Sequence, residues 1–204
     1  SAANHDPDYR AWGECYWNQN NRLLYWPLIE TGDYDLLRPW FQMYVNALPL
    51  AKDRMQLYYH HAGASLPETM YFFGLPRLAD FGRNNPSNVI QSTWQRYHIQ
   101  GTLEVIAQML DSYDNTTDTD FARSSLVPFA DAIVTFYDQH YPRDEHGKIH
   151  MAPAQSLETY QLVATNPTPD IAGLMADIPR LLNLPHNLTT EAQQAEWAKT
   201  IKDF

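Results

Sequence analysis

The sequence predicts an all-α protein. Apolar residues recur at spacings of three and four over most of the 204 residues, which is the period of helices with one buried face. No alternating run of β-branched residues is long enough to build a sheet. Prolines divide the chain into segments of helix length, at Pro76, Pro86, Pro142, Pro153, Pro167, Pro169 and Pro185.

The first strongly periodic helix is expected to begin at Asp33, which can cap it, and to run through Lys52 and beyond. Its broad apolar stripe consists of Leu36, Leu37, Trp40, Phe41, Tyr44 and Leu48. Four further helices are expected, over residues 88–112, 119–140, 169–182 and 189–199. Pro128 should either kink its helix or mark the first turn, because proline has no amide hydrogen to donate.

An amide-rich segment, residues 18–27, precedes these helices and reads Asn-Gln-Asn-Asn-Arg-Leu-Leu-Tyr-Trp-Pro. Asparagine is a poor residue for a helix interior, because its side chain competes for backbone hydrogen bonds. Neutral amides that bind hydroxyls, beside aromatic rings that cover the apolar face of a sugar, are what a carbohydrate cleft requires. The alternative is a helix N-cap followed by a buried aromatic face.

Composition excludes several classes of protein. A chain with 44% hydrophobic and 19% charged residues is globular, and its length fits one domain or a piece of a larger one. The net charge of −10 and the lack of Lys/Arg clusters argue against nucleic acid, anionic membrane and polyanionic substrates. No stretch has the length or hydropathy of a membrane helix, and the N-terminus lacks the pattern of a signal peptide.

Metal and cofactor sites are not expected. The single cysteine, Cys15, excludes an internal disulfide and a cysteine zinc site. The histidines lack the spacing of a helical zinc motif, and the 8 glycines do not cluster into a phosphate-binding loop.

Two loops share a pattern in which Ser-Leu is followed by Glu-Thr and a tyrosine. They are residues 64–71, which contain Glu68, and residues 154–160, which contain Glu158. A glycosidase needs one carboxylic acid that stays protonated and a second carboxylate across the sugar ring. We expect apolar neighbours to raise the pKa of both glutamates, because burial disfavours the charged form. The alternative for each is a helix-capping role.

These residues resemble a known family. Asn18 and Asn20, followed by Tyr25, Trp26 and Pro27, are similar to the Asn-x-Asn and Tyr-Trp-Pro signature of glycoside hydrolase family 95, the inverting α-L-fucosidases and related α-L-galactosidases. The loop between Gly63 and Gly74 has a matching length. Residues 113–118 resemble the family's Tyr-x-x-Thr-Gly-Asp turn, and residues 153–159 its Pro-Ser-x-Ser-Pro-Glu-Asn segment. A bacterial group with a toroid-like helical domain is similar as well.

The resemblance implies an (α/α)6 toroid with a central pocket. The general acid would be Glu158, and Asn18 and Asn20 would position the attacking water. The expected substrate contacts are Trp17, Arg22, Tyr25, Trp26, Glu68 and His98. The family's base is an aspartate beyond the acid, and no residue here matches its motif; Asp170 and Asp177 are expected on a helix outside the pocket.

Three departures from the family pattern are visible. Leu24 stands where the family has an asparagine, Pro67-Glu68 replaces a histidine pair, and Leu157 replaces a proline. Glu68 would bring a negative group to the pocket, where it could bind sugar hydroxyls or take part in catalysis, and Arg22 is expected to pair with it.

A complete toroid needs six hairpins, whereas the sequence predicts about seven helices. We therefore expect residues 1–204 to form an incomplete toroid within one domain, with the rest of a parent chain supplying the base and closing the ring. A compact helical domain that never closes is the alternative. The parent protein is expected to be periplasmic or secreted.

Three functions are open at this point. The first is an inverting hydrolase of a neutral oligosaccharide or polysaccharide, such as an α-L-fucoside or α-L-galactoside. The second is a polysaccharide lyase that uses a tyrosine or histidine base from residues 58–61. The third is a carbohydrate-binding domain without catalysis.

Overall fold

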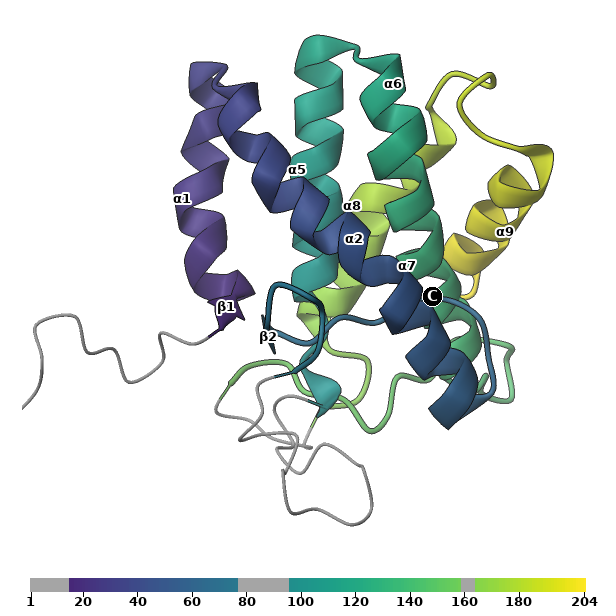
Figure 1. Cartoon of the computed structure of the whole chain (residues 1–204). Helices are drawn as coiled ribbons and strands as arrows, with labels where there is room; N and C mark the ends of the chain where they lie inside the picture. Colours follow the sequence, from purple (N-terminus) through teal and green to yellow (C-terminus); the bar gives the residue numbers. More distant parts are fainter. Residues whose placement is uncertain (1–14, 77–95, 159–163) are drawn as a thin grey trace, which may run out of the picture.

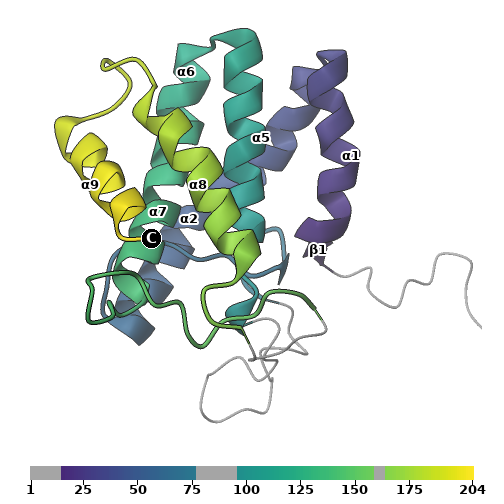
Figure 2. The same cartoon turned by 180° about the vertical axis from the view of Figure 1, so that it is seen from behind.

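The fold is all-α, and its packed helices form part of a helical toroid (Figures 1 and 2). The computed structural model describes residues 15–76, 96–158 and 164–204. The helices in these ranges are α1 (Asn18–Thr31), α2 (Tyr34–Tyr59), α5 (Gly101–Thr116), α6 (Thr119–Phe121), the π-helical turn η2 (Ala122–Leu126), α7 (Val127–His140), α8 (Thr168–Leu182) and α9 (Glu191–Lys202). The strands are β1 (Tyr16–Trp17) and β2 (Thr69–Met70). None of the described helices is long and apolar enough to cross a membrane.

The amide-rich segment forms helix α1, as its alternative interpretation predicts. Asn18 is the first residue of the helix, and Trp17 before it has an extended backbone. The helix ends at Gly32, whose positive φ of 77° lets its amide donate to the carbonyls of Leu28 and Ile29. α1 and α2 therefore form a hairpin that turns at Gly32 and Asp33.

Helix α2 confirms the predicted apolar stripe, with one exception. Leu37, Trp40, Phe41, Tyr44 and Leu48 are buried, whereas Leu36, in the first turn of the helix, is 59% exposed. The side chain of Asp33 makes no capping bond to α2 but accepts a hydrogen bond from Thr31 instead.

Helix α5 is the centre of the core and begins later than the sequence predicts. Residues 88–95 lie outside the described residues, and the helix starts at Gly101 rather than near residue 88. The Thr102 hydroxyl donates to the Ile99 carbonyl over 3.1 Å, which closes a turn just before the helix. α5 contacts α1, α2, α7 and α8, so most of its faces are buried (Figure 2).

The predicted helix over residues 119–140 is one continuous rod with a π-helical turn in it. The Asp118 side chain caps its start by accepting from the amides of Asp120 and Phe121. η2 follows and leads into α7, where Pro128 lies in the first turn. Because Pro128 cannot donate to the carbonyl of Ser124, the helix widens there instead of breaking.

Helices α8 and α9 occupy the predicted ranges and complete the packing. Gly173 of α8 packs directly on Leu103 of α5. A capping box between Thr190 and Gln193 starts α9.

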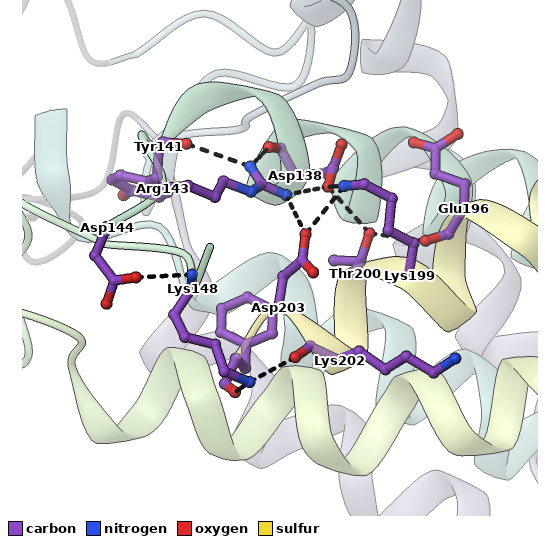
Figure 3. Close-up of polar contacts among 11 residues, drawn as sticks. Asp138, Tyr141, Arg143, Asp144, Lys148, Glu196, Lys199, Thr200, Lys202 and Asp203 are labelled. Carbon is purple, nitrogen blue, oxygen red and sulfur yellow. Dashed lines mark hydrogen bonds and ion pairs between the residues drawn. The ribbon is translucent and has the colours of Figure 1, made fainter. Parts of the chain in front are cut away.

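The C-terminal end of α9 is held to the segment after α7 by an ion-pair network (Figure 3). Arg143 contacts Asp138 and, over 2.9 Å, Asp203. Lys199 joins the same two carboxylates at 2.9 and 3.0 Å. The Lys148 ammonium adds hydrogen bonds to the carbonyls of Lys202 and Phe204.

Candidate active site

Four separate segments meet at the end of the bundle opposite the α1–α2 turn. The short strands β1 and β2 pair with Tyr16 opposite Met70 and Trp17 opposite Thr69, at the lower end of α1 in Figure 1. The Asn18 amide continues this pairing by donating to the Glu68 carbonyl over 3.0 Å. The N-terminus of α5 and the segment before residue 158 complete the site.

Glu68 is the buried carboxyl group of this site. Its side chain is 2% exposed, and Oε1 accepts a hydrogen bond of 2.6 Å from the backbone amide of Gln19. The pKa of Glu68 is raised to about 7, chiefly by burial; the charges of Glu104 and Glu158 also raise it, whereas the hydrogen bond from Gln19 and the charge of Arg22 lower it. The apolar setting predicted for this glutamate is therefore present.

Asn18 lies beside Glu68 and is buried too, with 3% exposure. Its Nδ2 donates to the Tyr44 hydroxyl over 3.0 Å, in the interior between α1 and α2. Burial raises the pKa of Tyr44 well above its usual range, so the hydroxyl stays protonated. Gly101 packs against the side chains of Asn18 and Glu68. A Cβ at this position would lie only 2.8 Å from Asn18 Oδ1 and 2.9 Å from Glu68 Oε2.

Asn20 does not share the surroundings of Asn18. The two residues lie two positions apart on a helix, and such residues point to nearly opposite sides. Asn18 is buried against Tyr44, whereas Asn20 is exposed. The expectation that both amides face one hollow is wrong for this reason.

Glu158 lies on an exposed loop that approaches the start of α1. Its Oε2 accepts a hydrogen bond of 3.4 Å from Gln19 Nε2, and its charge reaches Glu68. The expected apolar setting is absent here, because Glu158 is exposed and Leu157 is 51% exposed. The residues that follow Glu158, 159–163, lie outside the described residues, so the capping alternative stays a prediction.

The loop that holds Glu158 is closed at its neck. Ala154 and Ala164 form an antiparallel bridge. Asn166 donates from its backbone amide to the Met151 carbonyl and accepts from the Met151 amide through its side chain, over 3.0 and 2.7 Å. Inside the loop, the buried Gln155 donates to the carbonyls of Leu157 and Glu158.

Arg22 was expected to pair with Glu68. In the structure it forms its ion pair with Glu104 of α5 instead. Its charge still lowers the pKa of Glu68, and together with burial it lowers the pKa of His98 to about 4. His98 is therefore a buried, neutral imidazole at neutral pH.

The aromatic residues expected to contact substrate have packing roles in the structure. The ring of Tyr25 stacks on Trp40 of α2 at a centroid distance of 4.5 Å. Trp26 packs against the core, and Trp17 is half-buried in strand β1. The alternative interpretation is therefore met in part: Tyr25 and Trp26 are half-buried against the core, but no side chain of the amide-rich segment caps α1.

The residues of the lyase alternative lie elsewhere. Tyr58, Tyr59, His60 and His61 lie at the C-terminal end of α2, and fifteen residues of helix separate Tyr44 from Tyr59, a rise of about 22 Å. His61 Nε2 lies 2.9 Å from His140 Nδ1 there.

Two hollows help to locate the site. One lies between Asn18, Tyr44, Glu68 and Gly101 and is too small to hold a water molecule. The other has a volume of about 550 Å³, lies at the α1–α2 turn at the far end of the bundle, and contains none of the predicted site residues. The second hollow is therefore separate from the candidate site.

Asp170 and Asp177 are buried in helix interfaces of α8. Asp170 accepts a hydrogen bond of 2.7 Å from the Tyr137 hydroxyl of α7. Burial raises the pKa of Asp170 to about 7 and that of Asp177 to about 8. Their surroundings are the helices next to α8: Tyr137 of α7 contacts Asp170, and the charges of Arg180 and Asp111 act on Asp177.

Sequence reasoning missed Gln19, Gly101 and Glu104 as members of this site. A signal existed for Gly101, because a lone glycine inside a predicted helix often marks a close approach of another group. Gln19 lay inside the amide-rich segment.

Comparison with known proteins shows the family. Residues 4–203 match the family model described as the glycosyl hydrolase family 95 catalytic domain. A comparison with curated proteins gives no match.

Proposed function

Because this chain belongs to the catalytic domain of glycosyl hydrolase family 95, we propose that it acts as an inverting hydrolase of a neutral glycoside, with Glu158 as the general acid. The observation that carries the proposal is the position of Glu158. It is an exposed carboxyl group that is fixed by Gln19 and lies within electrostatic reach of the buried Glu68. An acid must be exposed to meet the oxygen of a glycosidic bond.

In the proposed reaction, Glu158 donates its proton to the glycosidic oxygen while the bond from that oxygen to the anomeric carbon breaks. A water molecule attacks the anomeric carbon from the opposite face and gives its proton to a carboxylate. We assign no described residue of this chain as that base. The product then has the opposite anomeric configuration from the substrate.

The two asparagines take different parts in this proposal. Asn20 is exposed one turn into α1, so it is the amide that can contact the attacking water or a sugar hydroxyl. Asn18 is buried between Tyr44 and Glu68 and holds the first turn of α1 in place.

The proposed substrate class is a neutral sugar such as an α-L-fucoside or α-L-galactoside. The net charge of −10 and the exposed carboxyl group of Glu158 disfavour an anionic ring at this site. We propose that the protein meets this substrate in the periplasm or outside the cell, and that further chain beyond this domain completes the site.

The test replaces Glu158 with glutamine in the full-length protein that contains this domain. General acid catalysis contributes about 10²–10⁴-fold, so Glu158→Gln should lower kcat/KM by that factor on a disaccharide. The loss should be much smaller on a glycosyl fluoride, because fluoride leaves without a proton. Glu145→Gln is the matched control, since Glu145 is an exposed glutamate in the turn that follows α7.

Three results would overturn the proposal. Unchanged turnover of the disaccharide by Glu158→Gln would exclude this residue as the acid. Binding of the sugar without any turnover by the unaltered protein would support the non-catalytic alternative. Proton NMR of the first product gives the anomeric configuration, and retention would exclude the inverting mechanism.

A further inference from the structure

Two buried oxygen acceptors lie beside Gly101, and neither has a hydrogen-bond donor within the described residues. Within the described residues, Glu68 Oε2 and Asn18 Oδ1 have no hydrogen-bond partner. Both lie within 2.9 Å of the point that a Cβ on Gly101 would occupy, so they border the same small space. Two lone-pair oxygens in this position repel each other unless a proton lies between them.

Neighbouring groups and water do not supply that proton. The backbone amide of Gln19 already donates to Glu68 Oε1, and the backbone amide of Asn18 donates to the backbone carbonyl of Glu68. The Thr102 hydroxyl donates to Ile99. The hollow that Asn18, Glu68 and Gly101 line has no room for a water molecule, so no solvent bridge forms.

We propose that Glu68 is a positioning residue that is protonated in the native protein, with its Oε2 hydroxyl donating to Asn18 Oδ1. This bond completes a chain of contacts from Glu68 through Asn18 to Tyr44. Glu68 also holds the Gln19 amide, so a single side chain fixes the first two residues of α1. Gln19 in turn holds Glu158.

The charges around Glu68 agree with a neutral side chain. Glu104 on α5 and Glu158 on the loop favour the protonated form, and Arg22 on α1 opposes it. Tyr44 on α2 is neutral because burial raises its pKa. Burial is the largest effect, and it brings the pKa of Glu68 to about 7.

If Glu68 is protonated in the folded state, the free energy of unfolding should depend on pH. The unfolded state releases this proton near pH 4.3, whereas the folded state keeps it up to about pH 7. Between these values the folded state binds the additional proton, so the wild type loses stability as pH rises through this window. Above about pH 7 this contribution is constant.

Glu68→Gln tests the proposal, because glutamine imitates the protonated acid at every pH. Its Nε2 can donate to Asn18 Oδ1 while its Oε1 accepts from Gln19. The melting temperature of Glu68→Gln minus that of the wild type should therefore increase from pH 4.5 to pH 7 and then stay level. Glu68→Met has a similar shape but no donor or acceptor, and it should be less stable than Glu68→Gln at every pH. Glu145→Gln, at an exposed position, should show no such trend.

A difference between Glu68→Gln and the wild type that does not vary with pH would overturn the proposal. In that case the side-chain amide of Asn18 is flipped by 180°, so that Nδ2 donates to an ionised Glu68 and Oδ1 accepts from the Tyr44 hydroxyl. Infrared difference spectra give a second test. The wild-type spectrum minus that of Glu68→Gln should contain a carbonyl band of a protonated carboxyl group that is lost as pH rises through about 7, because the bands of Asp170 and Asp177 cancel in this difference. A difference without this band contradicts the proposal.

The link to catalysis rests on the proposed function and has its own measurement. The kcat/KM of the wild type should fall as pH rises above about 7, and Glu68→Gln should keep its activity there. Because melting and infrared spectra need no substrate, the two hypotheses fail separately. Stability that titrates as predicted in a protein without turnover supports the role of Glu68 and contradicts the hydrolase.

Discussion

Asp177 of α8 should make the protein less stable at mildly alkaline pH. The residue is buried, and within the described part of the chain neither of its carboxyl oxygens has a hydrogen-bond partner. Arg180 lies near enough to lower its pKa but forms its ion pairs with Asp111 and Asp114. Burial dominates and raises the pKa of Asp177 to about 8.

The size of the effect follows from proton linkage. An unfolded aspartate has a pKa of about 3.9, and each pKa unit corresponds to about 1.4 kcal/mol, so the folded protein loses at most about 5 kcal/mol between pH 4 and pH 8 through this group. The folded pKa is the higher one, hence the stability is present at low pH and is lost as pH rises. Asp177→Asn removes the ionisation and should be more stable than the wild type at pH 8.5.

The assay is urea unfolding of Asp177→Asn and the wild type at pH 4 and pH 8.5. We expect similar free energies of unfolding at pH 4 and a gain of several kcal/mol at pH 8.5, which for a chain of this size is about 2–4 °C of melting temperature per kcal/mol. Asp114→Asn is the control, because it removes the same charge from an exposed partner of Arg180. An equal difference between Asp177→Asn and the wild type at both pH values would refute the reasoning.

Two further predictions concern packing and charge. Gly63→Ala should lower the free energy of unfolding by about 3 kcal/mol or more, because its Cβ would lie 2.4 Å from the backbone nitrogen of Phe136. Gly147→Ala has a similarly positive φ but open space around it, and should lower the free energy of unfolding by only about 1 kcal/mol. Urea unfolding compares the two variants, and equal losses would contradict the clash. Arg143→Met should cost about 1 kcal/mol at low ionic strength and less in concentrated salt, because it removes the pair with Asp138; a cost that salt does not change would contradict an electrostatic origin.

Helix positions were predictable where one face of the helix is buried. The stripe of α2 and the ranges of α7, α8 and α9 follow from local periodicity, and the structure confirms them. The start of α5 was not predictable in this way, because the turn at residues 99–102 depends on hydrogen bonds that a periodic pattern does not reveal.

The candidate site was predictable only in part. Glu68 has apolar neighbours in the sequence and a buried position in the structure. Glu158 has similar sequence neighbours but an exposed position, because a loop can turn its apolar residues to solvent. The contact of Gly101 with Asn18 joins residues far apart in the chain, and no local pattern indicates it.

The contacts that join the two ends of the Glu158 loop make the length of the loop independent of the stability of the helices. Since Ala154 meets Ala164 and Asn166 meets Met151, the two ends of the loop are already joined, and a change in its length alters the entropy of closure only slowly. Residues inserted or removed beyond this neck should move the Glu158 carboxyl group while the helices keep their packing. On the role proposed above for Glu158, the length of this loop is where linkage preference could be altered by design.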